Sequence, residues 1–430
     1  MCKSPACKKQ SVDLSSRTPY FSIMQSIYKK APVFCAALAV SILTCNTISA
    51  QTAGTLPPVE TKPANTKYKP AFAGQTRING VKTKTPLSFT LLNKTLDHPW
   101  GMALLPDGRF LISQKMGTMC IITPGGEIVK KITGLPEVVP NGQGGLLDVA
   151  VDPQFAANRM IYWDYSEQTS NGTLLAIAKG KLSADETKVE NIQVIYRATP
   201  AYKGSLQFGS RIVFDKNGNL FVSTGERSGT DIRMQAQSLS SSLGKIIHIT
   251  KTGKAVAGGP FAKTANARPE VYAYGLRSPE GLAMNPLTGE LWESEFGPMG
   301  GDEINIIRPG KNYGWPVVTY GVEYSGGKVG DGIQQKDGVQ QPAYYWDPVV
   351  SPAGIAFYNS NVIPEWKGNL FVGGLSSTHI ARLVIKNNKI IGEERFLKTE
   401  GERFRALAVG KDGALYAVTD AGKFYRIAKK

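Results

Sequence analysis

Cysteine is scarce in this sequence, and its distribution is uneven. Only five of the 430 residues are Cys, and four of them, Cys2, Cys7, Cys35 and Cys45, fall within the first fifty positions. Cys120 alone stands in the remainder, which excludes an internal disulfide framework there. The stability of that part must come from a buried apolar core and from any metal that it binds.

Long hydrophobic runs are missing beyond the N-terminal region. The one apolar run, residues 31–45, follows two lysines and precedes "ISA", which ends at residue 50. This order is typical of a secretory signal peptide and is too short for a membrane span. We therefore expect residues 1–50 to be an upstream extension and a signal peptide, and the mature chain to be exported to the periplasm without a transmembrane segment. Cleavage before Cys45, as in a lipoprotein, is the alternative.

Acidic residues are outnumbered by basic ones. The first fifty positions hold six of the 50 Lys and Arg and one of the 34 Asp and Glu, so 44 basic and 33 acidic residues remain, a net charge of about +11. A solvated basic surface explains this, and attraction to anionic substrates, cofactors or the envelope surface is the alternative. Nucleic acid is not expected as a partner, because Lys and Arg are dispersed and no recognition motif is present.

Histidine is rare as well. The three His, His98, His248 and His379, have no metal-type spacing with another His or Cys, and the chain has no Gly-x-Ser-x-Gly elbow. Serine and zinc hydrolase mechanisms are therefore disfavoured.

What the chain does have is a recurring pattern of an apolar strand, a polar turn with Gly or Asp, and a second apolar strand. Six copies begin at Gly101, Leu146, Ser210, Gly281, Gly354 and Ala406. Their spacing and the "PDG" and "KDG" turns predict antiparallel blades and an all-β, six-bladed β-propeller over residues 87–430. The strand predicted at 87–96 should join the last blade and close the ring. Residues 51–86, rich in Pro, Thr and Lys, are predicted to be an extended lead-in. Two packed sandwiches are the less economical alternative.

Propellers bind ligands at one mouth of the central channel, so polar residues at strand ends are the candidates for function. Arg403 and Arg405 alternate along one strand and should share a face, where, not facing acids, they would suit a polyanionic ligand. Arg277 precedes a Ser-Pro turn, and Arg211 follows the polar turn "GSLQFGS". Gln143 lies in a Gly-rich loop that allows close backbone approach. Ordinary surface arginines are the alternative interpretation.

A second candidate is the segment "SEFGPMGGDEINIIRPGKNYGWP", residues 294–316. Asp302 and Glu303 stand there beside Gly-rich turns that can point backbone carbonyls inward, and calcium binds carbonyl and carboxylate oxygens. An acidic turn capped by its own amides is the alternative.

Together these segments resemble the soluble aldose sugar dehydrogenases that depend on pyrroloquinoline quinone (PQQ), the glucose/sorbosone dehydrogenase family. The resemblance runs from about Ala71 to the end and includes "HPWGMALLPDGRFLIS", "GQGGLLDVAVDPQF", "FGSRIVF", "GPMGGDEIN" and "GERFRALAVGKDGALYAVTD". It implies a six-bladed propeller that holds PQQ and calcium at one mouth. It further implies that a histidine takes the proton of the sugar C1 hydroxyl while hydride passes to the quinone.

Carried over residue by residue, the resemblance assigns four residues to the cofactor. Gln143 matches a cofactor-contacting glutamine, Arg277 matches an arginine at the quinone, and Arg403 with Arg405 matches the pair that binds the cofactor's carboxylates. His98 lies in the shared "HPWG" segment, so we expect a structural role for it, as we do for His379.

The resemblance also assigns two calcium sites. Gly297 and Pro298 match carbonyl donors to the active-site calcium, while Glu303 and the carbonyl of Tyr313 match a separate structural site.

The departures from the family pattern are equally specific. Gln207 stands where the family has its catalytic histidine, and its amide cannot act as a general base near neutral pH. Polar groups expected nearby are replaced at Leu276, Ser278, Phe296, Met299 and Val349. The sequence therefore predicts a dehydrogenase of weak or altered activity that uses an external electron acceptor. The alternatives are a catalytically silent propeller that binds a saccharide, an envelope polymer or a protein, and a different reaction at the remodelled mouth.

Overall fold

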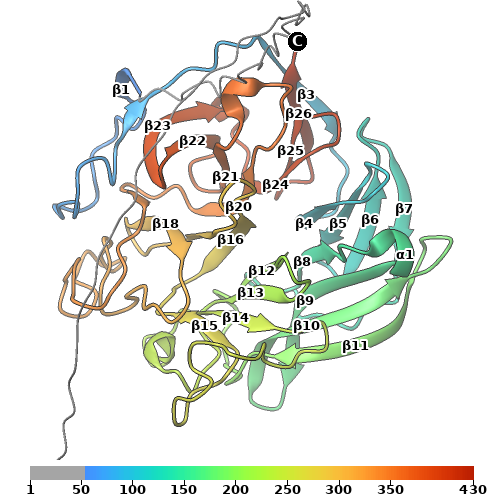
Figure 1. Cartoon of the computed structure of the whole chain (residues 1–430), viewed down its shortest axis with the longest axis horizontal. Helices are drawn as coiled ribbons and strands as arrows, with labels where there is room; N and C mark the ends of the chain where they lie inside the picture. Colours follow the sequence, from blue (N-terminus) through green and yellow to red (C-terminus); the bar gives the residue numbers. More distant parts are fainter. Residues whose placement is uncertain (1–53) are drawn as a thin grey trace, which may run out of the picture. The chain divides into compact units, whose positions relative to one another are not determined.

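The computed structural model describes residues 54–430, so the predicted signal peptide lies outside the described residues. Six sheets contain all of the strands β1–β26 named among the described residues, five with four strands and one with six. Figure 1 shows them set around a common axis like blades. The predicted fold class, an all-β six-bladed propeller, is therefore confirmed.

The first three blades follow one another along the chain, each with its innermost strand first. Blade 1 comprises β4 (Pro99–Leu104), β5 (Phe110–Gln114), β6 (Thr118–Ile122) and β7 (Ile128–Ile132). Blade 2 comprises β8 (Leu146–Val151), β9 (Met160–Thr169), β10 (Gly172–Leu182) and β11 (Val189–Arg197). Blade 3 comprises β12 (Gly209–Phe214), β13 (Leu220–Thr224), β14 (Lys245–Ile249) and β15 (Val271–Tyr274).

Blade 4 is built like the first three, whereas blades 5 and 6 also include strands from the N-terminal part of the described chain. Blade 4 comprises β16 (Pro279–Met284), β17 (Leu291–Glu295), β18 (Asp302–Ile307) and β19 (Tyr344–Trp346). Blade 5 comprises β20 (Pro352–Phe357), β21 (Leu370–Gly374), β22 (Ile380–Lys386) and β23 (Lys389–Phe396), with β2 (Asn79–Gly80) and β1 (Leu56–Pro58) outside β23. Blade 6 comprises β24 (Phe404–Val409), β25 (Leu415–Thr419), β26 (Phe424–Lys429) and β3 (Leu87–Asn93).

The ring closes as the sequence predicts. Strand β3 pairs antiparallel with β26, so the start of the propeller supplies the outer strand of its last blade. The lead-in ahead of β3 adds β1 and β2 to the edge of blade 5, where Gly80 pairs with Glu393. Because the two ends of the chain share blades, separating the first and last blades would require breaking a sheet.

The turns explain why the short apolar runs fold back on themselves. Between β4 and β5 the "PDG" segment forms a tight turn in which the Gly108 N–H donates to the Leu105 carbonyl at 2.9 Å. Gly108 has φ +95°, a conformation that glycine adopts without steric cost. Gly413 plays the same part in blade 6, with φ +73°.

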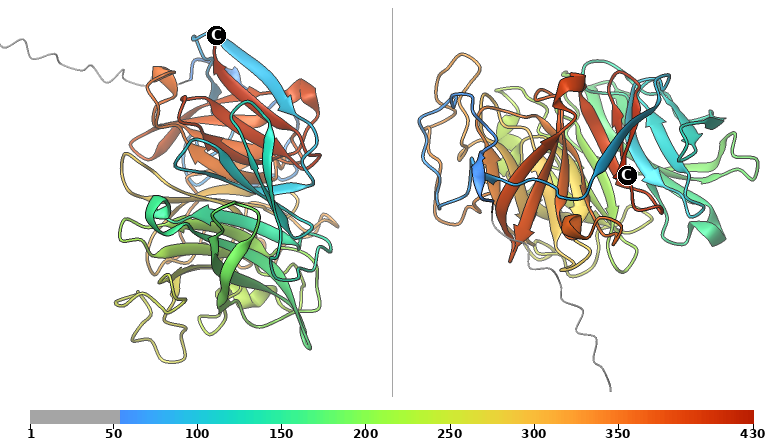
Figure 2. Two further views of the ribbon diagram at one scale, coloured as in Figure 1. Left: turned by 90° about the vertical axis from the view of Figure 1, so that its right-hand side faces the viewer. Right: turned by 90° about the horizontal axis from the view of Figure 1, so that it is seen from above.

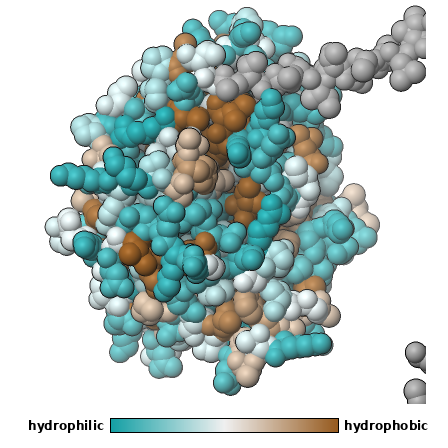
Figure 3. Space-filling view, turned by 60° about the vertical axis from the view of Figure 1, so that its left-hand side comes forward, coloured by the Kyte–Doolittle hydropathy of each residue, from teal (hydrophilic) through white to brown (hydrophobic). Residues whose placement is uncertain are grey.

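The hydrophobic core lies between blades. One cluster joins blades 1 and 2 through residues such as Leu111, Ile121 and Trp163, and five similar clusters join the other neighbouring pairs. Figure 2 shows the blades packed face to face from two further directions. On the face seen in Figure 3, hydrophobic residues form small groups among hydrophilic ones.

Helices are few and short among residues 54–430. They are α1 (Phe155–Asn158), η1 (Arg233–Gln237), η2 (Pro364–Trp366) and η3 (Lys398–Glu400). Within this part of the chain no helix has the length and apolar character needed to cross a membrane.

Candidate active site at the mouth of the propeller

The six innermost strands, β4, β8, β12, β16, β20 and β24, form a ring around the channel. A cavity of about 220 Å³ opens where several of them begin. Its lining includes Trp100, Gln143, Glu280, Arg403 and Arg405. Three of the residues predicted to contact a cofactor therefore lie at one mouth.

Arg403 and Arg405 share one face, as their alternation in the strand predicts, but they do face acids. Arg403 Nε donates to Asp420 Oδ2 at 2.8 Å, and Arg405 Nε donates to Asp420 Oδ1 at 2.8 Å. Arg405 Nη1 also donates to Glu280 Oε2 at 3.1 Å. The expectation that no acid faces this pair was wrong, because the antiparallel pairing of β24 with β25 brings Asp420 opposite Arg403.

The charge state of Asp420 follows from this contact. Burial opposes ionisation, but Arg405 and Arg403 together hold the pKa of Asp420 below its usual range. Asp420 therefore stays ionised at neutral pH and neutralises part of the arginine charge.

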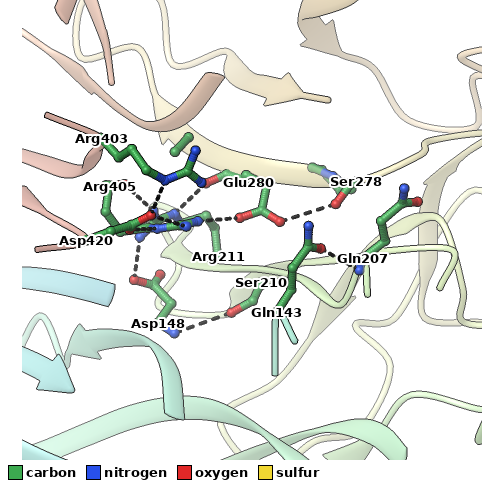
Figure 4. Close-up of polar contacts among 12 residues, drawn as sticks. Gln143, Asp148, Gln207, Ser210, Arg211, Ser278, Glu280, Arg403, Arg405 and Asp420 are labelled. Atoms are coloured by element: carbon green, nitrogen blue, oxygen red, sulfur yellow. Dashed lines mark hydrogen bonds and ion pairs between the residues drawn. The ribbon is translucent and has the colours of Figure 1, made fainter. Parts of the chain in front are cut away.

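Arg211 ties the blades together beneath this pair (Figure 4). Its Nη1 donates to Asp148 Oδ1 at 2.9 Å, its Nε to the Glu280 carbonyl at 2.7 Å, and its Nη2 to the Arg405 carbonyl at 3.0 Å. Its guanidinium also lies over the Trp100 ring, 4.3 Å from the centroid. Because Arg211 is buried and contacts several blades, its main role is to hold the mouth together.

Gln207 and Arg277 meet behind the mouth. Each is 5% exposed, and the backbone N–H of Gln207 donates to Gln143 Oε1 at 2.6 Å. The Gln207 amide is satisfied in one orientation, in which its oxygen accepts from Arg277 Nη2 at 2.9 Å and its nitrogen donates to Glu226. Gln207, matched to the catalytic histidine, and Arg277, matched to an arginine at the quinone, are the two predicted catalytic positions. They contact each other, and Gln143 connects them to the cavity.

Glu226 is a residue that sequence analysis missed. It is buried, and desolvation raises its pKa to about 7 although Arg277 opposes the shift. The chain at this place is strained as well, since Arg227 and Ser228 have φ values of +74° and +70°. No sequence motif marks Glu226, because its contact with Gln207 depends on the packing of two separate loops.

Among residues 54–430, four of the fifteen non-glycine residues with a positive φ lie where innermost strands begin. His98, Gln207, Ser210 and Ser351, none of them glycine, have φ values of +46°, +49°, +96° and +51°. Such conformations cost about 1–3 kcal/mol each and occur preferentially at functional sites. Their clustering supports the assignment of the mouth as the functional end of the propeller.

The three histidines differ in their surroundings. His98 lines the mouth, and its Nδ1 lies 2.7 Å from Asp97 Oδ1. His248 pairs with Asp215, which follows the far end of β12. His379 is buried, and desolvation lowers its pKa to about 3.

Gly297 stands at the centre of the predicted active-site calcium loop. Its N–H donates to Asp302 Oδ1 at 2.7 Å, and its carbonyl accepts from Arg277 Nη1 at 2.8 Å. Asp302 also accepts from the N–H groups of Val350 and Ser351, so its carboxylate holds the loop in shape. A carbonyl oxygen has two lone pairs, so Gly297 retains acceptor capacity for a cation beside Arg277.

Glu303 and Tyr313 line a second, small cavity of about 10 Å³ together with Arg277, Glu295 and Thr319. That volume holds about one water molecule or one ion. Burial and the charges of Glu295 and Asp302 raise the pKa of Glu303. Among residues 54–430 no group of three or more His, Cys, Asp and Glu has the geometry to hold a metal, so carbonyl oxygens would have to complete any calcium shell.

Further buried oxygen atoms lie close to this cavity. Asn305 Nδ2 donates to Glu293 at 3.1 Å, Glu295 at 3.3 Å and Glu303 at 3.2 Å, which gathers three carboxyl groups around one amide. Glu293 Oε1 and Asn305 Oδ1 are buried and have no hydrogen-bond partner. These oxygen donors fit calcium better than a transition metal.

The mouth also suits an anionic, flat ligand. Lys115, Arg403 and Arg405 bring positive charge to a cavity whose walls include the rings of Trp100 and Phe296. Behind it, Arg277 Nε is buried without a hydrogen-bond partner. Guanidinium groups bind carboxylates, so these residues fit a polycarboxylate such as PQQ.

The six blades place the chain in the class of six-bladed β-propellers. The model of the glucose/sorbosone dehydrogenase family matches residues 96–426. The chain therefore belongs to the glucose/sorbosone dehydrogenase family, which confirms the resemblance noted in the sequence.

Individual relatives agree with this assignment. Aldose sugar dehydrogenase YliI of Escherichia coli is 39% identical over 345 residues, which span 79% of this chain and 92% of that protein. Quinoprotein glucose dehydrogenase B of Acinetobacter calcoaceticus is 28% identical over 251 residues, 53% of this chain and 51% of that protein.

Solved structures agree as well. The apo form of the soluble E. coli aldose sugar dehydrogenase superposes with a TM-score of 0.76 at 38% identity, over 80% of this chain and all of that one. The PQQ-bound aldose sugar dehydrogenase of Streptomyces coelicolor gives 0.66 at 27% identity, over 81% and 99% of the two chains.

Proposed function

We propose that the protein oxidises aldose sugars to lactones in the periplasm, with PQQ and calcium, and that it does so weakly. The observation that carries this proposal is the meeting of Gln143, Arg403 and Arg405 at one mouth of a propeller from a sugar dehydrogenase family. The predicted signal peptide supports export, and an external electron acceptor would receive the electrons.

Each candidate residue has a role in this proposal. Arg403 and Arg405 would bind carboxylates of the cofactor, Gln143 would contact its edge, and Arg277 would lie at the quinone. When bound, PQQ supplies the hydride acceptor and calcium supplies Lewis acidity.

The metal ligands are proposed on the same basis. The carbonyls of Gly297 and Pro298 would hold the active-site calcium, and Glu303 with the Tyr313 carbonyl would hold a structural one.

Gln207 is the reason for expecting weak turnover. Its amide can hold the C1 hydroxyl of a sugar by a hydrogen bond but cannot take the proton, because an amide has no basic site near pH 7. Loss of a positioned base typically costs about 10²- to 10⁴-fold in rate. The sugar would still be bound and oriented, but water would have to take the proton of its C1 hydroxyl.

A silent propeller that binds a saccharide, an envelope polymer or a protein is the second candidate. It is favoured by the contacts of Gln207, whose amide is engaged with Glu226 and Arg277 behind the mouth. In this case the propeller would still bind its ligand but would no longer catalyse the oxidation of a sugar.

One experiment separates the two candidates. The purified mature protein is loaded with PQQ and calcium, and dye reduction is followed with a panel of aldoses. Slow turnover that disappears in Arg405→Gln supports the dehydrogenase. PQQ binding without turnover of any sugar favours the silent propeller, and absence of PQQ binding rejects the cofactor assignment.

A further inference from the structure

Glu280 is a buried carboxyl group in the wall of the mouth, and the proposed function leaves it without a role. It is 3% exposed and belongs to the first residues of β16, close to Arg277 in sequence. Its side chain accepts from Arg405 Nη1 at 3.1 Å and from Ser278 Oγ at 3.2 Å. It therefore occupies one of the two arginines to which a carboxylate ligand would bind.

The charge of Glu280 has a large effect on the net charge of the cavity lining. The lining includes three cations, Lys115, Arg403 and Arg405, and two carboxyl groups, Glu280 and Asp420. With both acids ionised, these five groups carry a net charge of +1, and with Glu280 neutral they carry +2. Asp420 is held ionised by two arginines, so Glu280 is the acid whose charge can change.

The hydrogen bonds of the two acids also indicate that Asp420 is held ionised more strongly than Glu280. Asp420 accepts three hydrogen bonds from guanidinium groups, whereas Glu280 accepts one from a guanidinium and one from a hydroxyl. Burial raises the pKa of Glu280, although Arg405 and Arg211 oppose the shift. A polycarboxylate arriving at Arg405 would place further negative charge beside a desolvated carboxylate, which is unfavourable unless a proton is bound.

We propose that Glu280 sets the affinity of the mouth for polycarboxylate ligands: it takes up a proton from solvent when the ligand binds and releases Arg405 to pair with the ligand. This inference rests on the proposed function, because PQQ is the polycarboxylate that it concerns. It makes cofactor loading a proton-linked equilibrium, favoured as the pH falls.

Other titratable or charged groups face the same space and need to be controlled for. They are His98, Lys115, Asp148, Arg211, Arg403, Arg405 and Asp420. Histidine is the residue type among these whose ordinary pKa lies nearest to neutral, so His98 is one competing source of a pH effect. Glu226 is another, because it lies behind the mouth beside Arg277 and burial raises its pKa to about 7.

The test is isothermal titration calorimetry of PQQ into the mature protein with saturating calcium, at several pH values between 6 and 8. Measurements in two buffers of different ionisation enthalpy give the number of protons taken up per PQQ. We expect the wild-type affinity to rise as the pH falls, by up to about tenfold per pH unit, with proton uptake of up to one.

The variant Glu280→Gln keeps the size of the side chain and removes its charge. It should bind PQQ more tightly than wild type at pH 8, with no proton uptake by this group and a flat pH dependence. The matched control His98→Gln should keep the wild-type pH dependence.

Three results would overturn the inference. If Glu280→Gln and wild type bind PQQ with equal affinity and equal proton uptake, Glu280 has no such role and the proposed function stands. If His98→Gln alone abolishes the pH dependence, the proton is taken up by His98. If neither wild type nor Glu280→Gln binds PQQ, the proposed function fails and this inference fails with it.

Discussion

With its amide in the orientation that its neighbours satisfy, the side chain of Gln207 accepts a hydrogen bond from Arg277 Nη2 at 2.9 Å, although 70 positions separate the two residues in the chain. Gln207 precedes β12 of blade 3, and Arg277 precedes β16 of blade 4. The contact therefore joins neighbouring blades behind the mouth and places an amide beside the guanidinium proposed to lie at the quinone.

The variant Gln207→His tests whether this amide limits turnover. An imidazole there would have a basic nitrogen near neutral pH and a carboxyl partner in Glu226, which now accepts from the Gln207 amide. We expect the kcat for aldose oxidation to rise by about 10²-fold or more, measured by dye reduction with PQQ and calcium. Gln207→Asn is the control, and an unchanged kcat in Gln207→His would reject the role of this position.

The variant Glu303→Gln tests the proposed structural calcium site. Calcium at 100 times its Kd would stabilise the folded protein by about 2.7 kcal/mol, because the ion binds only the folded state. We expect calcium to raise the Tm of the wild type and to have less effect on Glu303→Gln. Glu290→Gln, which removes a partner of Arg308 near the surface, is the control and should respond as wild type does. An equal calcium response in all three proteins would contradict the assignment.

The variant Arg211→Ala tests the network under the mouth. Arg211 is buried and paired with Asp148, so its removal leaves a buried acid without its cation. We expect the free energy of unfolding to fall by about 3–5 kcal/mol in denaturant titrations. Arg403→Ala removes a half-exposed arginine and should cost about 1 kcal/mol or less. Similar losses in both variants would show that the network adds no stability.

His379 should make the stability depend on pH. Its folded-state pKa of about 3 lies below the ordinary value of 6.5, so the unfolded chain binds the proton more readily. The stabilisation is complete above about pH 6.5 and is lost as the pH falls toward 3, by about 2 kcal/mol between pH 6.5 and 5.

The variant His379→Gln isolates this contribution in denaturant titrations. Its unfolding free energy should fall less steeply than that of the wild type between pH 6.5 and 5. His98→Gln is the control, because the side chain of His98 is 66% exposed, and it should follow the wild type. A wild-type slope in His379→Gln would contradict the buried neutral state.

Much of the fold could be predicted from the sequence, because each blade is formed by residues that lie close together in the chain. Alternating apolar strands and Gly-containing turns specify hairpins, and six copies specify the number of blades. The pairing of β3 with β26 was also predictable, since the strand at 87–96 precedes the first copy and the last copy has three strands of its own.

The candidate site was predictable only in part. The alternation of Arg403 and Arg405 along the strand predicted that their side chains share a face. The match of Gln207 to a catalytic histidine stays a prediction from the resemblance. The acids that pair with these arginines could not be predicted from the sequence. Asp420 lies opposite Arg403 because of the pairing of two strands, and Glu280 contacts Arg405 because the ring of blades is closed.

The sequence by itself determined the class of fold and the family. Local propensities and motif spacing are enough for these, since they depend on residues close together in the chain. Only the tertiary structure decided which charges meet at the mouth: Asp420 and Glu280 neutralise part of the arginine pair, Glu226 holds Gln207, and His98 lines the cavity. These contacts depend on blade closure and strand register, and the resulting burial sets the charge of each group.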